Sequence, residues 1–141
     1  AKQYEGKSCA KDNGMTENDL AAIVVDTSVH IHKRLGPGLL ESAYEAIVAY
    51  ELGRQGLSVE RQVPLPLIWN GMLVEDSFRA DIIVEKKLIL ELKSVERLLP
   101  VHKKQVLTYL RVTGLKLGLL LNFGTDLMKN GIVRLVNGLD E

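Results

Sequence analysis

The chain has 141 residues, 46% of them hydrophobic, and its 18 Lys and Arg residues balance its 18 Asp and Glu residues. This length suits one domain with a single filled core, and the neutral charge argues against a protein that coats nucleic acid nonspecifically. The only cysteine, Cys9, excludes an internal disulfide and a cysteine-based zinc site. No apolar run reaches the length of a membrane span, and the first residues lack the apolar stretch of a signal peptide. We therefore expect a soluble, cytoplasmic protein with no membrane partner.

The chain opens with a polar leader, residues 1–14, which shows no apolar periodicity and which we expect to be disordered or non-native. Met15 stands at or near the expected natural start of the protein. Thr16 and Asp19 resemble a capping box at the start of a helix, and apolar side chains then follow at helical spacing as far as Leu35. A Gly-Pro-Gly segment ends this first helix.

A second helix is expected over residues 39–52, with an inner face formed by Leu40, Ala43, Ile47 and Val48. From residue 57 the pattern changes to β-branched residues in alternation, which is typical of strands. Residues 57–63 and 65–76 predict strands, and Asn70-Gly71 in the second stretch is a pair that favours a tight type I′ hairpin turn.

Residues 78–94, FRADIIVEKKLILELKS, predict two further strands joined by a charged turn. Glu91 and Lys93 share a face because side chains alternate along a strand. The turn decides whether Asp81 joins them: a three-residue loop, 85–87, places Asp81 opposite Glu91, whereas a two-residue Lys-Lys loop turns it to the other face. Two-residue hairpin loops favour Asn or Gly, so we predict the three-residue loop.

The remaining elements are a helix over residues 101–113, a buried strand over 115–124 and a short last strand over 131–136. The expected order is thus two helices, four strands, one helix and two strands. Strands that follow helices in this way predict an α/β or α+β sandwich with a mixed central sheet.

The charges in the central hairpin suggest a chemistry. Asp81 and Glu91 would repel each other by roughly 4 kcal/mol at about 4 Å and an effective dielectric of about 20, so the pair needs a cation or a shared proton. Mg²⁺ commonly binds one or two carboxylates and completes its shell with water and phosphate oxygens. Lys93 beside it could orient or deprotonate water, or neutralise charge on a phosphate. These parts suit the hydrolysis of a phosphodiester.

The basic residues are concentrated in one segment. Residues 86–116 hold eight Lys and Arg against two Asp and Glu, whereas the 85 residues before them hold eight against 13. Lys103 and Lys104 lie in the expected helix of this segment and are candidates to contact phosphate. The alternative is an ordinary solvated helix face, and the sequence leaves both interpretations open.

Three motifs occur in the order found in one nuclease superfamily. The spacing D-x9-E-x-K from Asp81 to Lys93 resembles the core of the PD-(D/E)XK nucleases, with Ala-Asp in place of Pro-Asp. Gln105 and Tyr109 match the Q-x-x-x-Y motif of the RecB-like members, and residues 38–44, GLLESAY, match the G-x-x-E-x-x-Y motif of the GxxExxY proteins. Over most of its length the chain is therefore similar to the GxxExxY family of this superfamily.

The resemblance implies one domain over residues 15–141 with an α/β, restriction-endonuclease-like core, a mixed central β-sheet flanked by α-helices. It implies that Mg²⁺ or Mn²⁺ is bound by the carboxylates of Glu41, Asp81 and Glu91 and by the backbone carbonyl of Leu92. The implied catalytic residues are Glu41, Asp81, Glu91 and Lys93. Gln105 and Tyr109 would contact phosphate or hold the catalytic residues in place.

The resulting expectation is a metal-dependent nuclease acting on DNA, with RNA as an alternative substrate, and with a homodimer mate or protein partner supplying specificity. Two rival hypotheses remain: a catalytically silent binding or regulatory module, and a metal-free cluster in which Glu91 pairs with Lys93. Structural roles also remain open for three single residues. Glu41 could be a solvated helix residue, Tyr44 a packing residue, and Tyr109 a core residue with a satisfied hydroxyl group.

Overall fold

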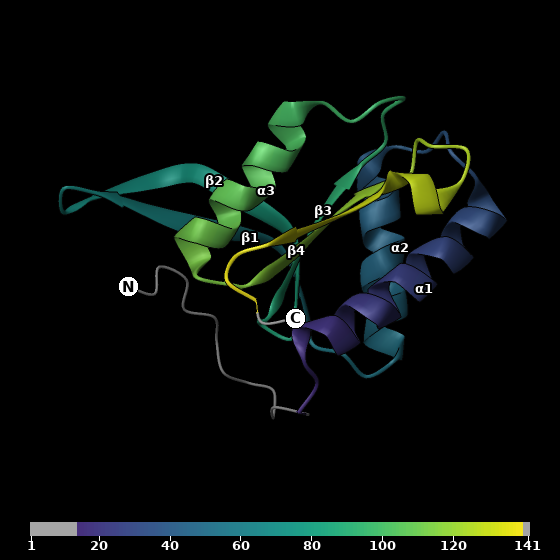
Figure 1. Cartoon of the computed structure of the whole chain (residues 1–141), viewed down its shortest axis with the longest axis horizontal. Coiled ribbons are helices and arrows are strands. Elements are labelled where there is room, and N and C mark those ends of the chain that lie inside the picture. Colours follow the sequence, from purple (N-terminus) through teal and green to yellow (C-terminus); the bar gives the residue numbers. More distant parts are fainter. Residues whose placement is uncertain (1–13, 140–141) are drawn as a thin grey trace.

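The computed structural model of the chain describes residues 14–139, apart from the side chains of residues 76 and 77 (Figure 1). Residues 1–13 of the expected leader, with Cys9, lie outside this range. The elements in chain order are α1 (Glu17–Leu35), α2 (Glu41–Arg54), β1 (Val59–Trp69), β2 (Met72–Val84), β3 (Leu88–Lys93), α3 (Pro100–Thr113), β4 (Leu117–Asn122), the short 3-10 helix η1 (Met128–Gly131) and β5 (Ile132–Val136). No helix within the described range is long and apolar enough to span a membrane.

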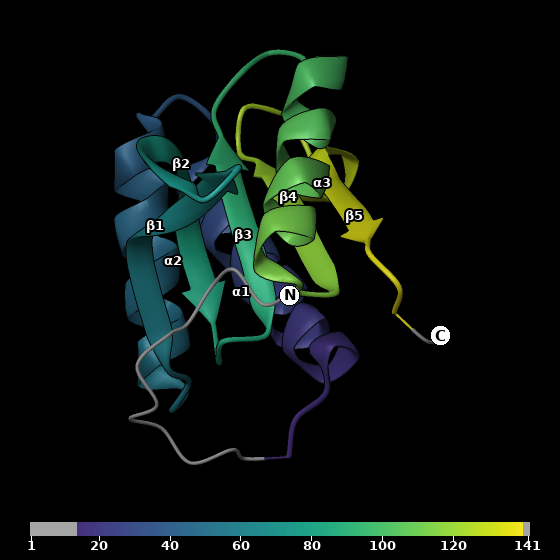
Figure 2. The same cartoon turned by 90° about the vertical axis from the view of Figure 1, so that its left-hand side faces the viewer.

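The five strands form one sheet in the order β1-β2-β3-β4-β5. β3 and β4 run parallel, and the other neighbouring pairs are antiparallel. A parallel pair needs a long crossover, and α3 supplies it. α1 and α2 cover one face of the sheet and α3 covers the other (Figures 1 and 2). The expected α/β architecture, a mixed sheet flanked by helices, is confirmed.

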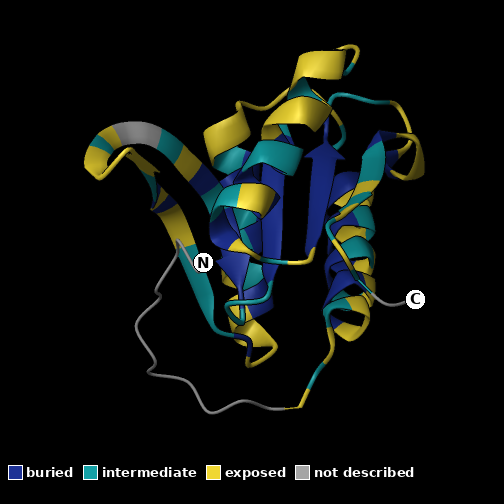
Figure 3. Cartoon of the chain, turned by 60° about the vertical axis from the view of Figure 1, so that its left-hand side comes forward, coloured by how far each residue is buried: buried dark blue, intermediate teal, exposed yellow. Residues whose placement is uncertain are grey.

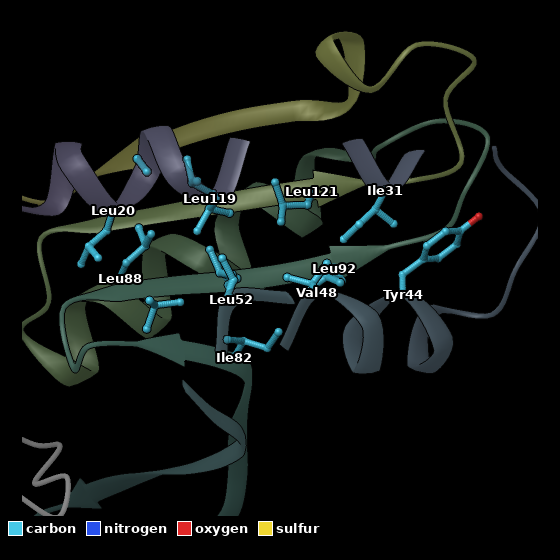
Figure 4. Close-up of a cluster of buried hydrophobic side chains, with 14 of the residues drawn as sticks. Leu20, Ile31, Tyr44, Val48, Leu52, Ile82, Leu88, Leu92, Leu119 and Leu121 are labelled. Atoms are coloured by element: carbon cyan, nitrogen blue, oxygen red, sulfur yellow. The ribbon is translucent and has the colours of Figure 1, made fainter. Parts of the chain in front are cut away.

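Each face of the sheet has its own apolar cluster. Between the sheet and the first two helices lie side chains of α1, α2 and the inner strands, among them Leu20, Tyr44, Val48, Leu52, Ile82, Leu88 and Leu119 (Figure 4). Under α3 lie Ile83, Ile89, Val106, Leu110 and Leu120, with others. β3 and β4 are therefore buried on both sides (Figure 3), which explains why their sequences are almost continuously apolar.

The structure joins the expected short strands into two long ones. β1 runs through Pro64 and Pro66 and pairs with β2 on either side of a register shift between Leu65 and Leu67. β1 is an edge strand, where a missing backbone N–H leaves no ladder partner unsatisfied. The sheet consequently has one strand fewer than expected. The Asn70-Gly71 turn is confirmed, because both residues have positive φ and the strands pair directly beside it.

The β1–β2 ribbon changes face beside Asp81. Val59 and Ile82 pack toward α1 and α2, whereas Val63 and Ala80 pack toward α3. Strict alternation would keep Val59 and Val63 on one face, because their residue numbers differ by four, an even number. The pairing skips Gln62 and Asp81, and Gln62 has a φ of 50°. A left-handed residue in β1 thus turns the ribbon, and Asp81 lies at the turning point.

The inner face of α2 differs from the expected one. Leu40 is 78% exposed, because it precedes the helix as its N-cap, and the buried residues are Tyr44, Glu45, Val48 and Leu52. Tyr44 stacks on Phe123 with ring centroids 4.4 Å apart. Its hydroxyl donates to the carbonyl of Gly36 at 2.6 Å and accepts from the N–H of Leu39 at 3.2 Å. The packing role considered for Tyr44 is confirmed, with a further role in fixing the α1–α2 loop.

We expect Tyr44→Phe to lower the free energy of unfolding by about 1–2 kcal/mol, because the carbonyl of Gly36 and the N–H of Leu39, which are only partly buried, lose their partner. Urea unfolding would measure the change. Tyr50→Phe is the matched control, since Tyr50 lies on the same helix and is 66% exposed. Equal stabilities for the two variants would contradict this role of the Tyr44 hydroxyl.

Candidate active site

The loop between β2 and β3 has the predicted odd length. Ile82 pairs with Leu90 and Val84 pairs with Leu88, which leaves Glu85, Lys86 and Lys87 as the loop. Glu85 and Lys86 take positive φ values of 51° and 54°. Continued by one step, this register sets Asp81 across from Glu91, as the loop length predicted.

The two carboxylates replace backbone acceptors where β2 and β3 separate. The ladder ends at the pair Ile82 and Leu90. Beyond it, the N–H of Asp81 donates to Glu91 Oε1 at 3.0 Å, and the N–H of Leu92 donates to Asp81 Oδ2 at 2.9 Å. Each carboxylate thus accepts a hydrogen bond from a backbone N–H of the other strand, and these two bonds hold both side chains in place.

Burial and neighbouring negative charge raise the pKa of both acids. Glu91 is 3% exposed, and burial together with the negative charge of Asp81 raises its pKa to about 8. Burial also raises the pKa of Asp81, with a further contribution from the charge of Glu45, although the hydrogen bond from Leu92 opposes the shift. A positive charge placed beside the pair would oppose both shifts.

Lys93 and the carbonyl of Leu92 both face this pair. Lys93 is half-buried, and its positive charge lowers the pKa of both Asp81 and Glu91. The N–H of Leu92 points toward β2, and in a strand the C=O of a residue points to the same side as its N–H. The Leu92 carbonyl therefore opens on the gap that holds the Asp81 carboxylate.

Tyr109 brings α3 to the carboxylates. It is buried, and burial followed by the charges of Glu91 and Asp81 raises its pKa to about 12. Its hydroxyl is hydrogen-bonded to the side chain of Gln105 and to the backbone of Arg79. Tyr109 is thus a satisfied core residue and a neighbour of the acid pair at once, while Gln105, one turn earlier, is exposed.

The predicted residues on the other helical surfaces do not meet the pair. Glu41 is exposed at the first residue of α2, and Lys103 and Lys104 are exposed on α3. Among residues 14–139, no three His, Cys, Asp or Glu side chains lie close enough to hold a metal ion together. The structure therefore brings Asp81 and Glu91 together without Glu41.

A different α2 carboxylate, Glu45, approaches the site. The side chain of Gln62 lies between Glu45 and Asp81. Its Nε2 donates to Glu45 Oε1 at 2.5 Å and to Asp81 Oδ1 at 3.3 Å. Arg61 forms an ion pair with Glu45 at 3.0 Å. Sequence reasoning missed all three residues. The only available signal was that Glu45 follows Glu41 by one helical turn and shares its side of α2.

The donor set suits a hard divalent cation. Asp81, Glu91 and the Leu92 carbonyl offer oxygen atoms only, and Mg²⁺ typically binds one or two carboxylates while water and phosphate fill the rest of its shell. A cation there would also relieve the repulsion that raises the pKa of both acids. The arrangement can therefore bind a metal ion with two carboxylates, although it offers no three-carboxylate cage.

Comparison with known proteins identifies the family. The profile of the PD-(D/E)XK nuclease superfamily matches residues 18–135. The chain belongs to the PD-(D/E)XK nuclease superfamily. Among solved structures, one described as "Crystal structure of SSO0001" is 18% identical, with a TM-score of 0.43, and the match covers 91% of this chain and 81% of the other. No curated protein matches the chain. Nucleases of this superfamily generally use divalent metals, which agrees with the donor set.

The raised pKa of Glu91 predicts a pH-dependent stability of the metal-free protein. Glu91 binds its proton more tightly in the folded state, with a pKa of about 8, than in the unfolded chain, where the ordinary value is 4.5. Stability from this group is present below the lower value and is lost as the pH rises toward the higher one, by up to about 1.4 kcal/mol per pH unit.

We expect Glu91→Gln to remove this loss, so that the variant is more stable than the wild type at pH 8 and the difference shrinks toward pH 5. Urea unfolding in EDTA across this range would measure it. Glu96→Gln, a change at an exposed glutamate on the segment after β3, is the control. If the stability of wild type and of Glu91→Gln changed with pH in the same way, the pKa of Glu91 would not be raised in the folded protein.

Proposed function

We propose that this chain is a metal-dependent nuclease that hydrolyses phosphodiester bonds in DNA, with Mg²⁺ or Mn²⁺ as its cofactor, in the cytoplasm. The observation that carries the proposal is the pair of buried Glu91 and half-buried Asp81 with Lys93 beside it, in a chain of the PD-(D/E)XK nuclease superfamily. Acids whose pKa values are raised by burial and by a neighbouring negative charge are concentrated at functional sites. We also propose that the chain belongs to the GxxExxY family, on residues 38–44.

Asp81, Glu91 and the Leu92 carbonyl would hold the metal ion. When bound, the ion polarises the phosphate and lowers the pKa of a water molecule. The strands hold the two carboxylates by backbone N–H groups, so their positions are set before any ligand arrives. Glu41 remains a proposed further ligand: the Ser94 hydroxyl donates to the Leu39 carbonyl at 2.8 Å and so ties the start of α2 to the end of β3.

Lys93 and Tyr109 would serve the reaction from two sides. Lys93 lies next to both acids and carries the positive charge that can stabilise a phosphate gaining negative charge, or orient the attacking water. Tyr109 has a pKa of about 12 and therefore keeps its proton at neutral pH. Its place beside Glu91, held by Gln105, suits it to fix the orientation of that carboxylate.

The exposed basic residues of α3 would contact the substrate backbone. Residues 97–113 carry Arg97, Lys103, Lys104 and Arg111 and no Asp or Glu. Such residues bind phosphate without reading sequence. A homodimer mate or a protein partner would supply specificity.

We expect Lys93→Ala and Asp81→Asn each to lower plasmid nicking by about 100-fold or more in Mg²⁺ or Mn²⁺, because each removes a group that acts on the reacting phosphate or its metal ion. EDTA should abolish the wild-type activity. Lys129→Ala and Asp26→Asn are the matched controls, since both residues are exposed on other elements, and they should nick like the wild type.

Wild-type protein that nicks no better than Lys93→Ala would contradict the enzymatic proposal. Retained nucleic-acid binding in that case would favour the silent binding module instead. Nicking that persists in EDTA would contradict the proposed metal dependence.

We expect Lys103→Ala/Lys104→Ala to weaken DNA binding at low salt and to lower the slope of log affinity against log salt concentration by about 2, because each lost phosphate contact releases roughly 0.9 fewer counterions. Fluorescence anisotropy with a short duplex in Ca²⁺ would measure this. An unchanged salt slope would place the substrate on another surface.

A further inference from the structure

The buried carboxylate of Glu45 has two hydrogen-bond partners, Arg61 and Gln62. It is 6% exposed on α2. Arg61 donates from Nε to its Oε2 at 3.0 Å, and Gln62 donates from Nε2 to its Oε1 at 2.5 Å. Each carboxylate oxygen thus accepts from one of two consecutive residues of β1, which anchors Glu45 to that strand.

Two consecutive strand residues can reach one carboxylate only because β1 is irregular there. Neighbouring side chains of a regular strand point to opposite faces. Gln62 has a φ of 50°, and the β1–β2 pairing skips Gln62 and Asp81. A non-glycine residue in this conformation is strained and persists where the surrounding contacts determine it. The contacts that determine it are those of its amide to Glu45 and Asp81.

The same amide group continues to the acid pair. Gln62 Nε2 donates to Asp81 Oδ1 at 3.3 Å, while Asp81 Oδ2 accepts from the N–H of Leu92 at 2.9 Å. The Asp81 carboxylate is therefore held from two directions. The amide is neutral, so it can hold Asp81 without adding the positive charge that would compete with a bound cation, as a lysine in its place would do.

We propose that Gln62 is a positioning residue, anchored by Glu45 and Arg61, that sets the orientation of the Asp81 carboxylate. Only the expected effect of Gln62 on metal binding rests on the proposed function. The hold on Asp81 itself exists without a metal ion. The left-handed backbone at Gln62 thus places a neutral donor, its side-chain amide, between Glu45 of α2 and Asp81 of the acid pair.

The test uses two variants and a matched control. Gln62→Leu removes the donor, and Gln62→Asn keeps an amide and tolerates the left-handed backbone but is too short to reach both carboxylates. Gln55→Leu removes an equivalent bridging amide, which donates to Thr27 Oγ1 at 2.9 Å away from the site. Each full-length protein would be measured by amide hydrogen exchange without metal and by calorimetry with Mn²⁺.

In the metal-free protein we expect both Gln62 variants to speed exchange of the Leu92 amide about tenfold relative to that of Leu90, because the acceptor of Leu92 is no longer held. The affinity for Mn²⁺ should fall by about 10- to 100-fold. Gln55→Leu should change neither. Leu92 exchange that stays at the wild-type ratio in both Gln62 variants would overturn the proposal, whatever happens to Mn²⁺ binding.

A wild-type protein that binds no Mn²⁺ would contradict the proposed function alone, and the Leu92 exchange would still decide the role of Gln62. Weaker Mn²⁺ binding in Gln55→Leu to the same extent as in Gln62→Leu would also overturn the proposal, because the effect would then be a general loss of stability.

Discussion

Two acidic side chains that meet where β2 and β3 separate determine the rest of this structure. At about 4 Å, two like charges repel by roughly 4 kcal/mol at an effective dielectric of about 20, and burial adds to that cost. The protein holds Asp81 and Glu91 together by backbone N–H groups from the facing strands. Burial and mutual charge then raise the pKa of Glu91 to about 8. The proposed metal site would therefore be preformed at the expense of stability, which is a common property of functional sites.

The layers of the fold serve this pair in different ways. The central strands supply the acids and Lys93, α3 supplies Tyr109 on one side, and α2 supplies Glu45 on the other. The β1–β2 ribbon changes face at Asp81, between Ile82 of one apolar cluster and Ala80 of the other. Asp81 stays half-buried there, whereas Glu91 is buried.

Local sequence signals predicted much of this arrangement. Thr16 and Asp19 form the expected capping box, and the poor fit of Lys-Lys to a two-residue turn correctly predicted the loop that sets Asp81 across from Glu91. Contacts between distant segments were not predictable. Nothing in the sequence indicates that Gln62 takes a left-handed conformation, and without that the link from Glu45 to Asp81 cannot be inferred. The motif pointed to Glu41, and packing adds a second α2 carboxylate, Glu45, which Gln62 links to Asp81.

We propose that Asp81 and Glu91 together bind a divalent cation. A crystal structure of the protein soaked in Mn²⁺, with the ion located by its anomalous scattering, tests this most directly. We expect one ion bound by oxygen atoms of both carboxylates at about 2.0–2.6 Å, with water completing its shell. Anomalous density that is absent from the pair, or that lies on other residues while Asp81 and Glu91 keep their mutual contacts, would contradict it.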